Sequence, residues 1–155
     1  MNIRPYERAD LSACEKIFDS NTPIFFAEEE RIEFTEFLAG LPGPYLVLEE
    51  HGEIVACGGW ANSRSTPNEI VLCWGMVRQD RHKQGLGIRL MQARLAQIFA
   101  NHPSAGVALT TSQHSAGFFA RYGFQPVRTQ KDGYAPGIDL VEMTLQAQSF
   151  FNDSQ

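Results

Sequence analysis

The segment that most restricts the fold lies mid-chain, where an apolar strand runs directly into a basic, glycine-containing turn and then a helix. Residues Glu69–Val77 (EIVLCWGMV) are nearly all apolar, which is typical of a strand buried inside a sheet. Residues Arg78–Leu90 (RQDRHKQGLGIRL) follow, and beyond them apolar side chains recur at helical spacing. The first turn of a helix is therefore expected at the end of a central strand.

The remaining sequence alternates between strand-like and helix-like patterns. Seven strands are expected, at Asn2–Pro5, Tyr45–Glu50, Glu53–Ala61, Glu69–Val77, Gly106–Thr111, Phe124–Thr129 and Ile138–Leu145. Four helices are expected, at Leu11–Phe18 after an Asp10 N-cap, Ala27–Ala39, Ile88–Phe99 and His114–Tyr122. The order β α α β β β α β α β β predicts one α/β domain on a mostly antiparallel sheet over residues 1–147, with 148–155 as a C-terminal tail.

Composition excludes several classes of protein. The chain of 155 residues is about one domain long, and its net charge of −5 disfavours binding to a phosphate backbone. No stretch approaches the roughly 20 apolar residues of a membrane span, and the N-terminus is too polar for a signal peptide. Three widely spaced cysteines suggest neither a disulfide framework nor a metal site. We therefore expect a cytoplasmic protein without metal, nucleic acid or membrane partners.

The glycine-containing turn has the chemistry of an anion site. Backbone N–H groups in the first turn of a helix lack intrahelical partners and carry partial positive charge. Gly85 and Gly87 would let a phosphate approach that backbone, and Arg81, His82 and Lys83 would add charge. The G-x-x-x-x-G-K-[ST] loop is absent, and G-x-G-x-x-G is not completed. A glycine-containing connection between a strand and a helix also occurs without any ligand.

Three motifs in this order resemble one family. They are I-R-P-x-x-x-x-D at Ile3–Asp10, H-K-Q-G-L-G at His82–Gly87, and F-F-A-R-Y-G-F at Phe118–Phe124. Together with the element order, they resemble the GNAT superfamily of acyl-CoA-dependent N-acetyltransferases over nearly the whole chain. The resemblance implies acetyl-CoA as co-substrate and direct attack by a primary amine of a small molecule or peptide. No metal is implied.

The same resemblance implies which residues contact acetyl-CoA. Backbone groups of Met76 and Val77 would pair with the pantetheine arm, beside a bulge at Gly75, in a slot where Gly106–Thr111 diverges from Glu69–Val77. The pyrophosphate loop and the neighbouring helix would supply the other contacts: His82, Lys83, Gln84, Gly85, Gly87, Ile88 and Phe119. His82 stands where the family usually has Gln or Arg. Phe119 stands where the family often has a tyrosine that protonates the leaving thiolate.

Candidates for proton transfer follow from these departures. Tyr122, three residues after Phe119, is the substitute acid. Glu69 is the candidate base, because alternation places it on one strand face with Cys73 and Gly75; an exposed glutamate at a strand start is the alternative. His114 is a second candidate for proton transfer, and a histidine that caps the helix or faces solvent is the alternative. Cys73 lacks an activating partner in the sequence, which favours a small buried side chain over a nucleophile.

The acceptor site is less defined by the sequence. The resemblance places it at Asn21–Phe26, Ala27–Ala39 and Lys131–Ile138, and the five glutamates of Ala27–Ala39 read either as an amine site or as a solvated helix face. Aromatic candidates for its wall, which the core would explain equally well, are Phe25, Phe26, Trp60, Trp74 and Tyr134. A GNAT-like module that binds acyl-CoA without efficient catalysis is the alternative to an enzyme. A homodimer is compatible with the sequence.

Overall fold

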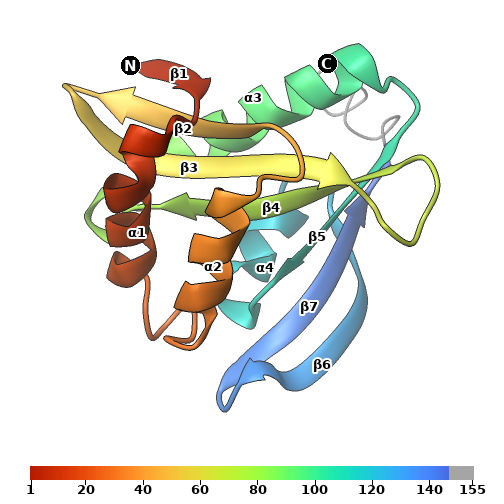
Figure 1. Cartoon of the computed structure of the whole chain (residues 1–155). Coiled ribbons are helices and arrows are strands. Elements are labelled where there is room, and N and C mark those ends of the chain that lie inside the picture. Colours follow the sequence, from red (N-terminus) through yellow and green to blue (C-terminus); the bar gives the residue numbers. More distant parts are fainter. Residues whose placement is uncertain (147–155) are drawn as a thin grey trace.

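Seven strands hydrogen-bond into one sheet in the computed structural model, which describes residues 1–146 (Figure 1). The strands are β1 (Asn2–Pro5), β2 (Tyr45–Glu50), β3 (Glu53–Asn62), β4 (Glu69–Val77), β5 (Gly106–Thr111), β6 (Gln125–Ala135) and β7 (Ile138–Leu145). Their spatial order is β1-β2-β3-β4-β5-β7-β6, and every neighbouring pair is antiparallel except β4 with β5. The predicted, mostly antiparallel sheet is confirmed.

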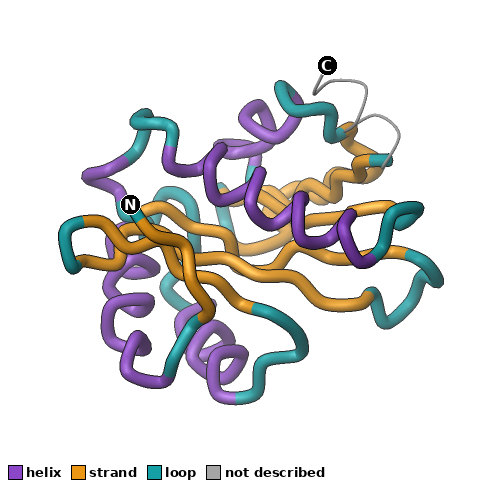
Figure 2. Tube along the Cα trace, turned by 90° about the horizontal axis from the view of Figure 1, so that it is seen from above, coloured by secondary structure: helices purple, strands orange, loops and turns teal. Residues whose placement is uncertain are grey.

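Helices cover both faces of this sheet (Figures 1 and 2). In the view of Figure 1, α1 (Leu11–Ser20) and α2 (Glu30–Ala39) lie in front, and α3 (Leu86–Asn101) and α4 (Gln113–Ala120) lie behind. Two short 3-10 helices, η1 (Arg8–Asp10) and η2 (Gln79–Arg81), precede α1 and follow β4. The predicted order of strands and α-helices is confirmed, and the expected tail at 148–155 lies outside the described residues.

Most element boundaries lie within about two residues of the expectation, and two differ by more, for identifiable reasons. Helix α2 begins at Glu30 rather than Ala27, because the Glu30 carboxylate accepts a hydrogen bond from the N–H of Ala27 (2.8 Å) and closes a turn before the helix. Strand β6 continues to Ala135 rather than ending at Thr129, since its pairing with β7 resumes at Ala135 after an irregular stretch. The expected Lys131–Ile138 loop is therefore mostly strand.

Alternation along the strands divides the core in two. On one face, buried residues of β2, β3 and β4 pack under α1 and α2, and these include Val47, Cys57 and Met76. On the other face, Leu46, Leu48 and further strand residues pack against the apolar stripe of α3. A side-chain period of two produces this division, because successive residues of a strand point to opposite faces.

The sheet is interrupted at its centre. Strands β4 and β5 pair only where Glu69–Val71 lies beside Gly106–Ala108, and beyond these residues no pairing connects them. Strand β4 also bulges: Cys57 pairs with Met76 and Gly59 with Cys73, so two residues of β4, Trp74 and Gly75, face one residue of β3. The separation opens a cleft in the sheet, and the bulge lies at its edge.

Candidate functional site

A cavity of about 740 Å³ occupies the space between β4 and β5. Its walls come from the turn between α1 and α2, the C-terminal half of β4, the start of α3, the end of β5, α4 and the end of β6. The volume is within the range of ligand sites, about 300–1,000 Å³. The predicted V-shaped slot is thus present, and it opens toward both layers of helices.

One end of the cavity is the start of α3. Gly85 is the N-cap of this helix and has a positive φ of 80°, a conformation that costs glycine little. No side chain caps the first turn, so its N–H groups are available to an anion. A Cβ at Gly87 would make only ordinary contacts with Phe118 and Val77, at 3.5 and 3.7 Å, so the backbone there is uncovered without being crowded.

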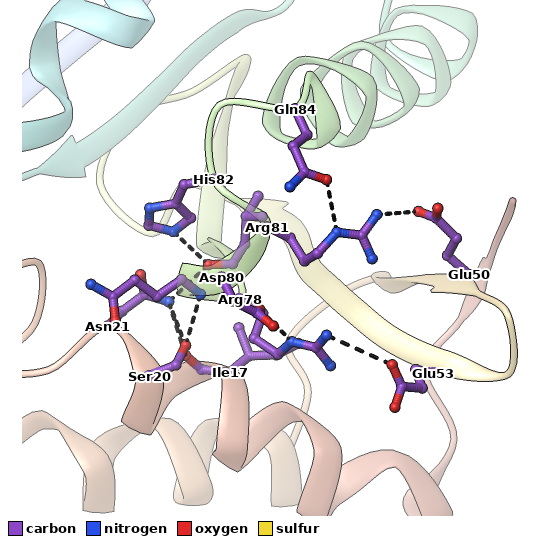
Figure 3. Close-up of polar contacts among 12 residues, drawn as sticks. Ile17, Ser20, Asn21, Glu50, Glu53, Arg78, Asp80, Arg81, His82 and Gln84 are labelled. Atoms are coloured by element: carbon purple, nitrogen blue, oxygen red, sulfur yellow. Dashed lines mark hydrogen bonds and ion pairs between the residues drawn. The ribbon is translucent and has the colours of Figure 1, made fainter.

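Polar contacts fix the turn that leads to this helix (Figure 3). The Asn21 amide donates to the carbonyl oxygen of Val77 (2.9 Å), and Nε2 of His82 lies 2.8 Å from the same oxygen. The hydroxyl of Ser20 accepts from the N–H of Gln79 at 3.0 Å. The end of α1 therefore holds the turn in place. The Val77 carbonyl thus has two polar partners within the protein.

Most of the basic charge in the turn is neutralised. Arg81 contacts the carboxylate of Glu50 at 2.9 Å, and its Nε donates to Gln84. Arg78 forms ion pairs with Asp80 (2.7 Å) and, more weakly, Glu53 (3.7 Å), as Figure 3 shows. The charge expected from Arg81 is therefore directed to the β2–β3 hairpin. Lys83 and the backbone amides of the first helical turn are the donors of this loop that line the cavity or lack a side-chain cap.

The expected acetyl-CoA contacts are brought together with one exception. Lining the cavity are Met76, Val77, His82, Lys83, Gly85, Gly87, Ile88 and Phe119. Gln84 does not line it and instead accepts from Arg81. The bulge expected at Gly75 is confirmed. It is held by the buried Tyr45, whose hydroxyl donates to the carbonyl oxygen of Trp74 at 2.8 Å.

The three candidates for proton transfer lie in different places. Tyr122 and His114 line the cavity, and the His114 N–H is capped by Ser112 at the start of α4. Glu69 lines a separate small cavity of about 130 Å³, at the end of β4 where this strand is still paired with β5. Alternation along β4 places Glu69 on the same face as Val71 and Cys73, which line the cleft. Glu69 itself lies outside the cleft, because β4 is still paired with β5 at this residue.

Glu30 is the carboxylate that lies in the cleft instead. It is the only acidic side chain among the described cavity-lining residues, and it is 8% exposed. Burial raises the pKa of Glu30 above its ordinary value, and the hydrogen bond from Ala27 opposes this only in part. The sequence left two interpretations of the five glutamates of Ala27–Ala39, an amine site or a solvated helix face. The structure separates them, because Glu30 lines the cleft and the other four are exposed: Glu28, Glu29, Glu33 and Glu36.

Arg94 of α3 is a second charged residue that the sequence did not single out. It is 3% exposed, lines the cavity and lies directly under the bulge, where a Cβ on Gly75 would be 2.7 Å from its Nη2. Nη1 donates to the carbonyl oxygen of Gly59 at 3.3 Å, and Nε has no hydrogen-bond partner within the described residues. Burial lowers the pKa of Arg94 to about 10, so the side chain is charged at neutral pH.

Aromatic rings surround the cleft on the side of α1 and α2. Phe25, Phe26, Trp74 and Tyr134 line the cavity as expected, whereas Trp60 is buried in the core against α3. Cys73 also lines it, and burial raises the pKa of its thiol, which keeps the thiol protonated. Within residues 1–146 no group of three or more His, Cys, Asp or Glu side chains could hold a metal ion, and no helix is long and apolar enough to cross a membrane.

Comparison with solved structures shows the same fold in several acetyltransferases. The ribosomal-protein-S18-alanine N-acetyltransferase of Escherichia coli matches with a TM-score of 0.76 at 20% identity, over 94% of this chain and 93% of that one. An aminoglycoside 6′-N-acetyltransferase complexed with coenzyme A matches with a TM-score of 0.76 at 14% identity, over 95% and 97%. An N-acetyltransferase of Staphylococcus aureus gives 0.74 at 18%, over 94% and 98%.

At this level of identity, structural likeness establishes the fold, and the family rests on the sequence. No curated protein sequence matches the chain. The family model described as an acetyltransferase (GNAT) domain matches residues 29–147, which include the glycine-containing turn, both strands that separate and most of the residues that line the cleft. The chain therefore belongs to the GNAT acetyltransferase family.

Proposed function

We propose that this protein transfers the acetyl group of acetyl-CoA to a primary amine of a small molecule. The observation that carries the proposal is the cleft between β4 and β5, which joins an uncovered helix N-terminus to an aromatic chamber containing one carboxylate. The first turn of α3 would bind the pyrophosphate of coenzyme A, and the cleft would receive the pantetheine arm. The acyl group would then lie near the bulge in β4.

In the proposed reaction the neutral amine attacks the thioester carbonyl. A C–N bond forms and the C–S bond breaks, so the amine nitrogen loses a proton and coenzyme A leaves as a thiolate. Glu30 is suited to receive the proton, directly or through water, because its raised pKa brings a carboxylate closer to the operating pH. Tyr122 remains the proposed donor to the thiolate, and His114 is a further titratable group that lines the cleft. Glu69 has no place in this scheme.

The test measures thiol release from acetyl-CoA in the presence of amines, together with binding of coenzyme A by calorimetry. Gly87→Ala is the informative variant, because its methyl group fits the protein yet covers the amides that would bind phosphate. Loss of one or two such charge-assisted hydrogen bonds should weaken binding by about 10- to 100-fold. Gly40→Ala, at the end of α2 with no neighbour within 4 Å, is the matched control.

The absence of the usual tyrosine at Phe119 gives the alternative a specific basis. If coenzyme A binds and Gly87→Ala weakens it, but no amine in a broad panel releases thiol, the protein is an acyl-CoA-binding module. If Gly87→Ala binds coenzyme A as the wild type does, the assignment of the pyrophosphate site is wrong.

A further inference from the structure

The part of the cavity nearest α2 combines aromatic rings with a single carboxylate. We call Phe25, Phe26, Phe37, Trp74 and Tyr134 the aromatic wall; all five are half-buried and line the cavity. They come from the turn between α1 and α2, from α2, from the bulge of β4 and from the end of β6. Glu30 lines the same cavity at the first residue of α2. Segments far apart in the sequence thus build one chamber.

Trp74 holds the wall together. Its ring stacks on Phe26 with centroids 6.0 Å apart and approaches Phe37 at 6.3 Å. Its backbone has a φ of 44°, a conformation unfavourable for a bulky residue, and the hydrogen bond from Tyr45 to its carbonyl oxygen supports it there. The bulge therefore turns the indole of Trp74 toward the chamber. In a regular strand, alternation would place Trp74 on the opposite face of the sheet, together with Leu72.

The Glu30 carboxylate has one oxygen that is available to a ligand. One carboxylate oxygen accepts from the N–H of Ala27 at 2.8 Å, and no hydrogen bond reaches the other from any residue in the described part of the chain. A buried carboxylate with an unused oxygen favours a cationic partner, because burial without compensation is costly. Aromatic faces attract cations as well, and tryptophan does so most strongly. The chamber therefore suits an ammonium group.

The charges around the chamber limit how many ammonium groups a ligand can carry. Apart from Glu30, the charged residues among the described lining are Arg81, Lys83, Arg94 and Arg121, which are all cationic. Arg81 is paired with Glu50, whereas Arg94 is buried without a carboxylate partner among the described residues. The carboxylates nearest Glu30, those of Glu29 and Glu33, are exposed and do not line the cavity. A second or third ammonium group would therefore find no further carboxylate in the described lining and would be repelled by Arg94. The rings of the aromatic wall form most of the remaining surface that a ligand could contact there.

On the basis of the proposed transfer reaction, we propose that the acceptor is a monocationic primary amine attached to an apolar, aryl or alkyl, body. Glu30 binds its ammonium group before transfer, and the aromatic wall covers the apolar body. This class differs from the aminoglycoside and the ribosomal-protein alanine named for two of the structural neighbours.

The experiment compares 2-phenylethylamine and ethylamine with spermidine, kanamycin and an alanine-terminated peptide, as acceptors in thiol release from acetyl-CoA. Calorimetry on the protein saturated with coenzyme A measures binding of the same amines. We expect kcat/KM for 2-phenylethylamine to exceed that for each polycation and for the peptide by at least about tenfold. The ring should also bind better than the ethyl group, since burying apolar area is favourable.

Two variants examine the two halves of the recognition. Glu30→Gln keeps the shape and removes the charge, and should weaken 2-phenylethylamine binding about 10- to 100-fold. Glu33→Gln, on the same helix but exposed and outside the cavity, is its matched control. Phe25→Leu should raise KM for 2-phenylethylamine about fivefold and raise KM for ethylamine by a smaller factor, since the ethyl group buries less of the ring. Phe25 suits this test because its ring neighbours, His82 (5.4 Å) and His114 (6.0 Å), also lie at the cavity.

The outcomes separate this proposal from the transfer reaction itself. Thiol release with spermidine, kanamycin or the peptide in preference to 2-phenylethylamine would overturn the substrate class and leave the transferase intact. Binding of 2-phenylethylamine that depends on Glu30, without turnover of any amine, would support the class of ligand while refuting the reaction. Equal binding by Glu30→Gln and wild type would overturn the role of the carboxylate.

Discussion

The buried guanidinium of Arg94 should lower the free energy of unfolding of the ligand-free protein, compared with an uncharged side chain of similar volume at this position. No carboxylate in residues 1–146 lies within ion-pair distance, and burial lowers the pKa of this arginine from its ordinary value to about 10, which corresponds to about 3 kcal/mol of unfavourable burial. Arg94→Met keeps a long, flexible stem of similar volume and removes the charge. The carbonyl of Gly59 loses a hydrogen bond at 3.3 Å, which costs about 1 kcal/mol.

The variant should therefore be more stable than wild type by about 2 kcal/mol, or roughly 4–8 °C in Tm for a chain of this length. Urea unfolding followed by tryptophan fluorescence, with no coenzyme A present, measures the difference. Folded and unfolded pKa values of Arg94 both exceed pH 9, so the gain should be constant from pH 6 to 9. It should shrink only as the pH rises from about 10 toward 12.5, where the folded-state penalty disappears.

Arg89→Met is the matched control, since this exposed arginine of the same helix contacts only the Met1 sulfur, at 3.4 Å, among the described residues. Its effect should stay within about 0.5 kcal/mol. If Arg94→Met lowers the free energy of unfolding by 1 kcal/mol or more while the control does not, the guanidinium stabilises the fold and the reasoning from desolvation fails.

Two further substitutions concern the N-terminal ion pair and the bulge. Hydrogen bonds from Arg4, at 2.8 and 2.9 Å, hold the pKa of Asp10 below its ordinary 3.8, so their contribution is complete above that value and is lost as the pH falls through the lowered one. Asp10→Asn should destabilise by about 1–2 kcal/mol at pH 7, and urea titrations should show the gap closing between pH 5 and 2. Gly75→Ala should cost about 1–3 kcal/mol, because its Cβ would lie 2.7 Å from Nη2 of Arg94. A double-mutant cycle with Arg94→Met should show coupling of at least about 0.5 kcal/mol; additive effects would contradict that contact.

Local chemistry explains which parts of the fold could be predicted. The hairpin at His51–Gly52 forms with both residues at positive φ, and the nearly continuous apolar run of β4 lies at the centre of the sheet. The glycine-containing turn enters α3 as expected, because Gly85 readily adopts the positive φ that the N-cap position requires here. These features depend on a few adjacent residues and can therefore be predicted from the sequence.

The charged residues of the cleft depend on contacts over long distances. Glu30 differs from its neighbouring glutamates only because the turn before α2 packs beside β4, and no pattern within the helix reveals this. Arg94 did leave a sign in the sequence: it lies four residues from both Leu90 and Ile98, inside the apolar stripe of α3. A charged residue at such a position suggests either a buried partner or a functional cavity.

Glu69 illustrates a different limit of sequence reasoning. A period of two assigns a residue to a face of the sheet, but the cleft begins only where β4 and β5 part, after Val71. The aromatic chamber lies beyond the bulge. The bulge changes the alternation at Trp74 and so turns this ring to the face where a regular strand would not place it. If the acceptor binds in this chamber as proposed, changes at the bulge should alter which amine is used before they alter binding of coenzyme A at the start of α3.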